Sequence, residues 1–332
     1  MRYRTLNILH KMTQDKFALK LSTQVFILCA TLVVLQIHHG TNLVYLRTSK
    51  KQQHFTTNLK QLEKDEDESR LPAVIYTFFS PLTTMTAGMT HSSHDKLLYA
   101  WKKEWQARGW KTRILNIQHA KKHKHFQYFN QTIVKKFPQV SEYDRMCFFR
   151  WLAMSVVGGG FMADYDTFPL EFDSNEYFDG NLPNNGNFTS FDGFVPALVS
   201  GIGEEWDRMA LELLEAIQNQ NFTDFVSDMF ALKFITKMKP SSFVNEVVKK
   251  NRNDIFNGIF YKSVGMVDCK RMNEKKAIHF SHYATAETTK SNLLSEFNKS
   301  DVGGALENRW KVSTDFIRTW KAQCKKVVTT ID

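Results

Sequence analysis

The sequence predicts an α/β fold whose central sheet is largely parallel. Residues Ala73–Phe79 form a β-branched and aromatic run that is typical of a buried strand. Residues 91–108 carry apolar side chains at helical spacing, and Lys111–Leu115 then indicates a second strand. A strand, a helix and a strand with short links form the unit from which parallel sheets are built. The third observation is a strand that starts in glycines and ends in two aspartates.

That strand begins at Gly158 and leads into Asp164-Tyr165-Asp166, and Pro169 is expected to end it. In an extended segment, side chains at i and i+2 point to the same side, roughly 6 to 7 Å apart. Asp164 and Asp166 can therefore address one divalent cation at the carboxyl end of a strand, where open α/β sheets bind ligands. Carboxylates suit Mg²⁺ or Mn²⁺, which proteins commonly share with substrate phosphates. An isolated Asp-x-Asp is usually a solvated turn, so the buried strand before it is what predicts a site for a nucleotide diphosphate.

A helix is predicted just before this strand. Ser141 is its expected cap, with Asp144 three residues further on. Arg150 falls on the apolar face of the helix, where a guanidinium needs a partner. Two interpretations stay open: a structural pair with a carboxylate, or support for Asp164, Asp166 or a diphosphate.

The remaining elements follow from their apolar spacing. They are strands within Phe188–Val199, a helix capped by residues 200–204 that runs through Ile217, a helix over Asp224–Ile235, a strand over Ala277–His282 and a closing helix over Asn308–Cys324. Asp192 and Asp228 are candidates for acceptor binding or for a catalytic base. A solvated or capping role is the more common one for such residues.

The charge distribution excludes nucleic acid as a partner. The net charge is +10, but residues 1–60 hold nine Lys/Arg and one acidic residue, whereas the remainder holds 35 basic and 33 acidic residues. The body is therefore almost neutral, without the basic surface that nucleic-acid binding requires.

The basic N-terminus instead predicts a membrane signal. Residues 1–20 form a basic tail, and residues 21–37 form an uncharged apolar segment at the short end of what spans a bilayer. The excess of basic residues before this segment predicts a cytosolic N-terminus and a type II signal anchor. A cleaved signal peptide is the competing interpretation. Residues 38–70 are then a polar stem, and residues 71–332 are a luminal catalytic domain of the Golgi or ER.

Two further features agree with a luminal body. N-glycosylation sequons occur at Asn130, Asn187, Asn221 and Asn298. Cys29 lies in the apolar segment, which leaves Cys147, Cys269 and Cys324 in the body. Three cysteines allow at most one disulfide and a free thiol, and the pairing stays open.

The arginine, glycines and aspartates together resemble the core of Golgi glycosyltransferases with an Asp-x-Asp motif. Arg150, Gly158-Gly159 and Asp164-x-Asp166 are similar to the pattern of glycosyltransferase family 32, which includes fungal outer-chain mannosyltransferases and capsular-polysaccharide transferases. The likeness extends over about residues 75–170, and Ala277-Ile278-His279 is similar to a late element of the family.

This resemblance implies a GT-A fold, a Rossmann-like sheet that binds a UDP- or GDP-sugar. Asp166 would bind Mn²⁺ or Mg²⁺ directly, His279 would be a further ligand, and Asp164 would contact ribose or a metal-bound water. Arg150 would orient the site, and Thr77 in the first strand is a candidate donor contact. The sugar would pass to a glycan, lipid or protein acceptor with retention of anomeric configuration.

Two other functions remain as alternatives. A metal-dependent phosphoester hydrolase would use the same aspartates, although it usually needs a second metal cluster. A non-catalytic luminal binding protein is the other, because Met146, Cys147 and Met162 depart from the residues that the family usually has at these positions.

Overall fold

The computed structural model of the chain describes residues 73–82, 88–177, 180–219 and 226–325. The expected tail, anchor and stem lie outside these ranges, so their boundaries stay predictions. Among the described residues, no helix combines the length and apolar character needed to cross a membrane.

The central sheet has six strands in the order β2-β1-β3-β6-β5-β7. They are β1 (Val74–Phe78), β2 (Lys111–Leu115), β3 (Gly159–Ala163), β5 (Thr189–Ser190), β6 (Leu198–Ile202) and β7 (Val244–Asn245). The pairs β2–β1, β1–β3 and β5–β7 are parallel, whereas β3–β6 and β6–β5 are antiparallel. The mixed α/β fold with a mostly parallel sheet is therefore present, and it is compatible with a GT-A arrangement.

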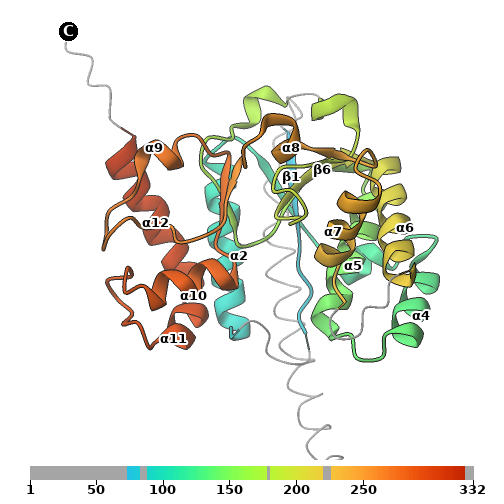
Figure 1. The fold of residues 1–332 in the computed structure, drawn as a ribbon, viewed down its shortest axis with the longest axis horizontal. Helices are drawn as coiled ribbons and strands as arrows, with labels where there is room; N and C mark the ends of the chain where they lie inside the picture. The colour runs from blue at the N-terminus through green and yellow to red at the C-terminus, as the bar shows by residue number, and fades with distance from the viewer. Residues whose placement is uncertain (1–72, 83–87, 178–179, 220–225, 326–332) are drawn as a thin grey trace, which may run out of the picture. The chain divides into compact units, whose positions relative to one another are not determined.

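The helices cover both faces of this sheet. They are α2 (His91–Gln106), α3 (Ile117–Ala120), α4 (Phe126–Lys136), α5 (Glu142–Val156), α6 (Gly203–Asn219), α7 (Asp228–Met238), α8 (Glu246–Lys250), α9 (Cys269–Met272), α10 (His282–Lys290), α11 (Val302–Glu307) and α12 (Arg309–Cys324). Figure 1 shows α2 and α12 on one side of the sheet and α5, α6 and α7 on the other.

The alternation of side chains along β3 explains why both faces are filled. Phe161 packs into the core with α2 and α12, and its neighbour Met162 packs into the core with α5 and α6. Successive side chains of a strand point to opposite faces, so a strand buried on both faces carries a continuous apolar run. The predicted buried strand is confirmed, and the helix predicted over residues 91–108 buries Trp101 and Trp105 completely.

A second, three-stranded sheet has the order β4-β9-β8, with β4 (Thr167–Pro169), β8 (Ile255–Phe256) and β9 (Ala277–His279). The expectation that Pro169 ends the glycine-started strand is wrong in detail. β3 ends earlier, at Ala163, and Pro169 is the last residue of β4 at the edge of the second sheet. Proline has no N–H to donate to a neighbouring strand. An edge strand tolerates it because that strand has a neighbour on one side only.

The C-terminal helix is attached covalently to the body. Cys324 at the end of α12 forms a disulfide with Cys269 at the start of α9, and Cys147 is a free thiol. One disulfide and one free cysteine agree with the count that the sequence allows.

Two adjacent glycines provide a matched test of how β3 begins. Both have φ in the left-handed region, +87° at Gly158 and +86° at Gly159. A Cβ at Gly158 would meet nothing within 4 Å, but one at Gly159 would lie 2.4 Å from the Gly201 carbonyl oxygen. We expect Gly158→Ala to lower the free energy of unfolding by ~1–2 kcal/mol, through backbone strain alone.

Gly159→Ala should lower the free energy of unfolding by about 1–3 kcal/mol more than Gly158→Ala does, because strands β3 and β6 must also move apart. Chemical denaturation of both variants measures the difference. Equal losses at the two positions would contradict the close approach of β3 and β6.

Candidate active site

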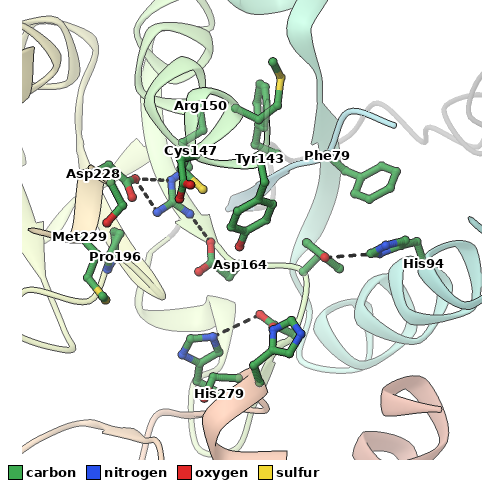
Figure 2. Close-up of a pocket in the computed structure, with 18 of the residues that line it drawn as sticks. Phe79, His94, Tyr143, Cys147, Arg150, Asp164, Pro196, Asp228, Met229 and His279 are labelled. Atoms are coloured by element: carbon green, nitrogen blue, oxygen red, sulfur yellow. Dashed lines mark hydrogen bonds and ion pairs between the residues drawn. The ribbon is translucent and has the colours of Figure 1, made fainter. Parts of the chain in front are cut away.

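The carboxyl ends of β1 and β3 border a cavity of about 380 Å³. Its wall combines the segment after β1, the first turns of α5, the β3–β4 turn, the start of α7 and the end of β9, as Figure 2 shows. Ligand sites in proteins are usually clefts of roughly this size. The cavity lies where the sequence predicts a site, at the carboxyl ends of parallel strands.

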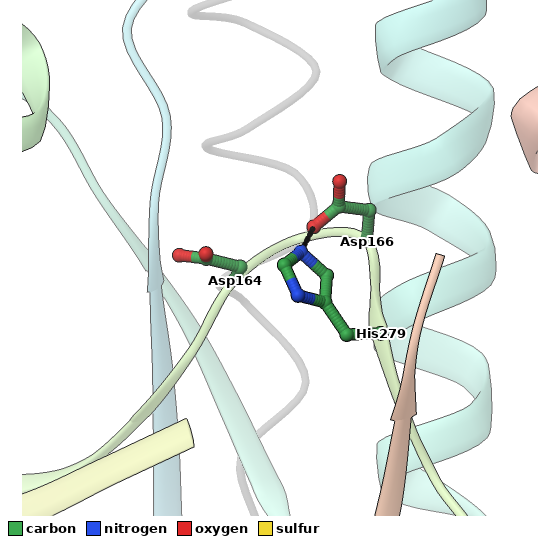
Figure 3. A group of neighbouring side chains, drawn as sticks. All are labelled: Asp164, Asp166 and His279. Carbon is green, nitrogen blue, oxygen red and sulfur yellow. Dashed lines mark ion pairs between the residues drawn. The ribbon is translucent and has the colours of Figure 1, made fainter. Parts of the chain in front are cut away.

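Three side chains in this cavity can converge on one cation. One ligand atom from each of Asp164, Asp166 and His279 lies within 4.8 Å of the others, and Figure 3 shows the three side chains together. The expected extended geometry of the aspartates is wrong, because they follow β3 in a turn in which the Thr167 N–H donates to the Asp164 carbonyl. The turn still brings both carboxylates to the same place.

His279 reaches the aspartates through the pairing of β4 with β9. These strands are antiparallel with Thr167 opposite His279, and the Phe280 N–H donates to the Asp166 carbonyl at 2.9 Å. The His279 Nε2 atom consequently lies 3.3 Å from Asp166 Oδ1. Backbone hydrogen bonds of the small sheet thus position one carboxylate against the imidazole.

Arg150 from α5 connects two carboxylates. Its Nη1 donates to Asp164 Oδ1 at 2.5 Å, and its Nε and Nη2 donate to Asp228 Oδ2 at 2.8 and 2.6 Å. Asp228 also accepts a hydrogen bond from Trp151 Nε1 at 2.9 Å. Figure 2 shows the guanidinium between the two acids. The pair that Arg150 forms with carboxylates is buried and includes Asp164. A role of Arg150 toward a diphosphate stays a prediction.

Arg309 at the start of α12 holds the other aspartate. It is 1% exposed, and its Nη1 donates to Asp166 Oδ2 at 2.8 Å. Arg309 is not among the residues predicted from the sequence, although the pattern that indicates Arg150 is present here too. Arg309 shares a helical face with the buried Val312, Phe316 and Trp320, and a guanidinium on an apolar face needs a partner.

The surroundings shift the pKa values of the two aspartates of the motif in opposite directions. Burial raises the pKa of Asp164, and the nearby charges of Arg150 and Asp166 act on it in opposite directions. Burial also opposes ionisation of Asp166, but His279 and Arg309 outweigh it and lower the pKa of Asp166 to about 2. Asp166 is therefore a carboxylate near neutral pH, as a metal ligand must be.

The donor set fits a divalent cation. Two carboxylates and an imidazole offer the oxygen and nitrogen ligands that Mn²⁺, Mg²⁺ and related ions accept. His279 Nδ1 is buried and has no hydrogen-bond partner among the described residues, so Nε2 is the nitrogen that faces the carboxylates. Asp164, Asp166 and His279 would hold the ion.

The other predicted residues lie in different surroundings. Thr77 is completely buried in β1, is not among the residues that line the cavity, and its hydroxyl has no partner within the described part of the chain. Asp192 also lies outside the cavity lining, where the Asn253 amide donates to its Oδ1 at 2.5 Å. Asp228 and Cys147 do line the cavity.

Comparison with known proteins assigns a family. The model of a domain family of unknown function, DUF8765, matches residues 56–279. The chain belongs to the DUF8765 family. The match spans the Asp-x-Asp turn, Arg150 and His279, and it ends before Arg309. It gives no family-level support for glycosyltransferase family 32.

Two other comparisons add little to the DUF8765 assignment. No curated protein matches the chain. A solved structure described as a glycosyltransferase involved in the glycosylation of the major capsid of PBCV-1 is similar with a TM-score of 0.30 and 9% identity, over 71% of this chain and 99% of that chain. Similarity this low supports no functional argument, so the geometry of the site must supply one.

Asp192 offers a test of how strongly burial penalises a carboxylate beside the cavity lining. Burial raises its pKa to about 6, against which the Asn253 hydrogen bond acts. Since the unfolded value is about 3.9, ionisation of the folded protein is penalised, and stability falls as the pH rises from about 4 to about 6. Asp192→Asn should therefore raise the free energy of unfolding by up to about 3 kcal/mol at pH 7.5 and change it little at pH 4.

Denaturation at the two pH values measures this, with Asp173→Asn as a control for the loss of one surface charge. A loss of stability in Asp192→Asn that is equal at both pH values would contradict a penalised carboxylate.

Proposed function

We propose that this DUF8765 protein is a metal-dependent glycosyltransferase that moves a sugar from a UDP- or GDP-sugar to a glycan, lipid or protein acceptor. The convergence of Asp164, Asp166 and His279 in a cavity at the carboxyl ends of parallel strands carries the proposal. A divalent cation bound there, Mn²⁺ or Mg²⁺, would act as a Lewis acid on the leaving diphosphate.

The charges around the site support a diphosphate ligand. Asp164, Asp166 and Asp228 face the guanidinium groups of Arg150 and Arg309. Burial lowers the pKa of His279, but Asp166 outweighs this and raises it in the metal-free protein. Metal binding requires the neutral imidazole, and in that state this group carries one net negative charge. It therefore attracts a divalent cation, and with the cation bound it becomes net positive and attracts an anion. The protein thus favours a cation and a diphosphate together over either alone.

The positions of the acids favour retention of configuration. An inverting transferase needs a carboxylate base that is free to take a proton from the acceptor. Asp228 accepts three hydrogen bonds from Arg150 and Trp151 on one oxygen. Asp192 lies outside the cavity lining. Asp228 lines the cavity but is held in an ion pair by Arg150. Neither acid considered as a base is thus both in the cavity and free of an ion pair, which supports a mechanism without a dedicated base.

A phosphoester hydrolase is less well supported. Hydrolases of this kind commonly use two metal ions about 3.5–4 Å apart. Within the described residues, Asp164, Asp166 and His279 form the one group of three or more acids, histidines or cysteines close enough to bind an ion together. The binding-protein alternative is left to experiment.

Nucleotide release tests the proposed activity. The purified full-length protein should release UDP or GDP from one donor of a nucleotide-sugar panel in the presence of Mn²⁺, and a chelator should stop the release. Asp166→Ala should lower the rate about 100-fold or more, because the charge that develops on the diphosphate loses its stabilisation.

Asp173→Ala removes an acid outside the cavity lining and serves as the control. Phosphate release from simple phosphoesters would favour the hydrolase. Failure to bind any donor would leave the binding protein as the better account.

The location is part of the proposal as well. We infer a single-pass type II protein of the Golgi or ER membrane, anchored by residues 21–37, with residues 71–332 in the lumen. The support is the basic and apolar N-terminal pattern, the sequons and the disulfide between Cys269 and Cys324. Disulfides form and persist in oxidising compartments such as the ER lumen.

The sequon at Asn298 tests the location. Asn298, Lys299 and Ser300 are all exposed, and the Ser300 hydroxyl donates to Asn298 Oδ1 at 2.6 Å. By contrast, Thr189 of the Asn187 sequon is completely buried. We expect an N-glycan on Asn298 that endoglycosidase treatment removes, because a luminal, exposed acceptor is accessible to the glycosylation machinery.

Asn298→Gln and Ser300→Ala should each reduce the mobility shift on gels by one glycan, and Ser300→Thr should retain it. A full-length protein from secretory-competent cells that is insensitive to the enzyme would argue against a luminal body.

A further inference from the structure

The buried guanidinium of Arg309 contacts the candidate metal site from a part of the chain that the family match does not include. Its polar contacts are Asp166 Oδ2 at 2.8 Å, the Phe280 carbonyl at 3.4 Å and the Met89 sulfur at 3.0 and 3.3 Å. The carboxylate of Asp166 is the only full negative charge among these contacts. A buried guanidinium is costly without such a partner.

The two oxygens of Asp166 are divided between two neighbours. Oδ2 accepts from Arg309, and Oδ1 faces His279 Nε2 at 3.3 Å. A carboxylate that is held by one oxygen in a geometrically rigid hydrogen bond cannot rotate freely about its last torsion. Oδ1 is thereby left as the atom of Asp166 that faces His279.

The arrangement repeats on the other aspartate. Arg150 from α5 holds Asp164 Oδ1, as Arg309 from α12 holds Asp166 Oδ2. α5 and α12 belong to the cores on opposite faces of the central sheet. Each aspartate of the motif thus has its own arginine, and the two arginines approach from opposite sides.

We propose that Arg309 is a positioning residue that orients Asp166 for metal binding, so that α12 completes the Asp164–Asp166–His279 site. The inference rests on the function proposed above insofar as that function requires a metal at this group. It adds that the segment matched by the family, residues 56–279, does not contain the whole site. The disulfide at Cys324 fastens the far end of the same helix to α9.

Mn²⁺ affinity of the full-length protein, measured by titration calorimetry without any donor, tests this role. Arg309→Met should weaken Mn²⁺ binding about 10- to 100-fold, the range in which residues that orient metal ligands act. Arg309→Lys keeps the charge but has no rigid fork. It should recover part of the affinity, and it carries the test if the Met variant fails to fold. Arg318→Met removes an exposed arginine of the same helix and should leave the affinity unchanged.

The alternative is that Arg309 acts through its charge or only through stability. Removing a nearby positive charge without any orienting effect would strengthen cation binding. Folded Arg309→Met or Arg309→Lys with unchanged or tighter Mn²⁺ binding would overturn the proposal. In a double-mutant cycle with Asp166→Asn, Arg309→Met should cause little further loss, because the residue acts through Asp166. Full additivity would overturn it as well.

The same measurements separate this inference from the proposed function. Wild-type protein that binds Mn²⁺ in an Arg309-dependent way but releases no nucleotide from any donor would contradict the transferase and support the positioning role. Wild-type protein that binds no Mn²⁺ would overturn the metal site and this role together. Nucleotide release that needs Mn²⁺ but is equal in the wild type and Arg309→Met would contradict the positioning role alone.

Discussion

The candidate site depends on the pairing of two short strands, β4 and β9. Their antiparallel register places Thr167 opposite His279 and adds a hydrogen bond from the Phe280 N–H to the Asp166 carbonyl. A slip of one residue would turn the His279 side chain to the other face of the small sheet, because strand side chains alternate. The register therefore determines whether an imidazole and the carboxylates meet at all.

The buried carboxylates near His279 are paired with buried arginines. Carboxylates in a low-dielectric cavity repel one another and are costly to ionise, and each is therefore matched with a cation. Arg150 is shared between Asp164 and Asp228, and Arg309 pairs with Asp166, which leaves one net negative charge. The site is consequently close to neutral and ordered by its own residues. This is the condition in which binding a cation requires little rearrangement of the ligands.

The central sheet was predictable because its signals are local. The consecutive apolar residues Phe161 and Met162 indicate a strand buried on both faces. Ser141 and Asp144 indicate the start of α5, where the Asp144 N–H donates to the Ser141 hydroxyl. The sequence indicates the antiparallel strands β5 and β6 less clearly. They are short and separated by a turn, and the sequence from Ser200 to Ile202 that was assigned to a helix cap lies in β6. Strand direction depends on pairing partners, which short apolar runs do not specify.

The sequence by itself determined the parallel start of the sheet, the Asp164–Asp166 motif at its edge and the candidate Arg150, since each follows from spacing within one segment. His279 became a candidate ligand through the family resemblance. Only the tertiary structure decided that a turn, and not an extended strand, brings the aspartates together. It also decided that Asp228 pairs with Arg150, that Thr77 is buried away from the cavity lining and that Arg309 holds Asp166. The physical reason is that ion pairs and metal ligands join residues far apart in the chain, and a buried charge gives no indication in the sequence of which partner it has.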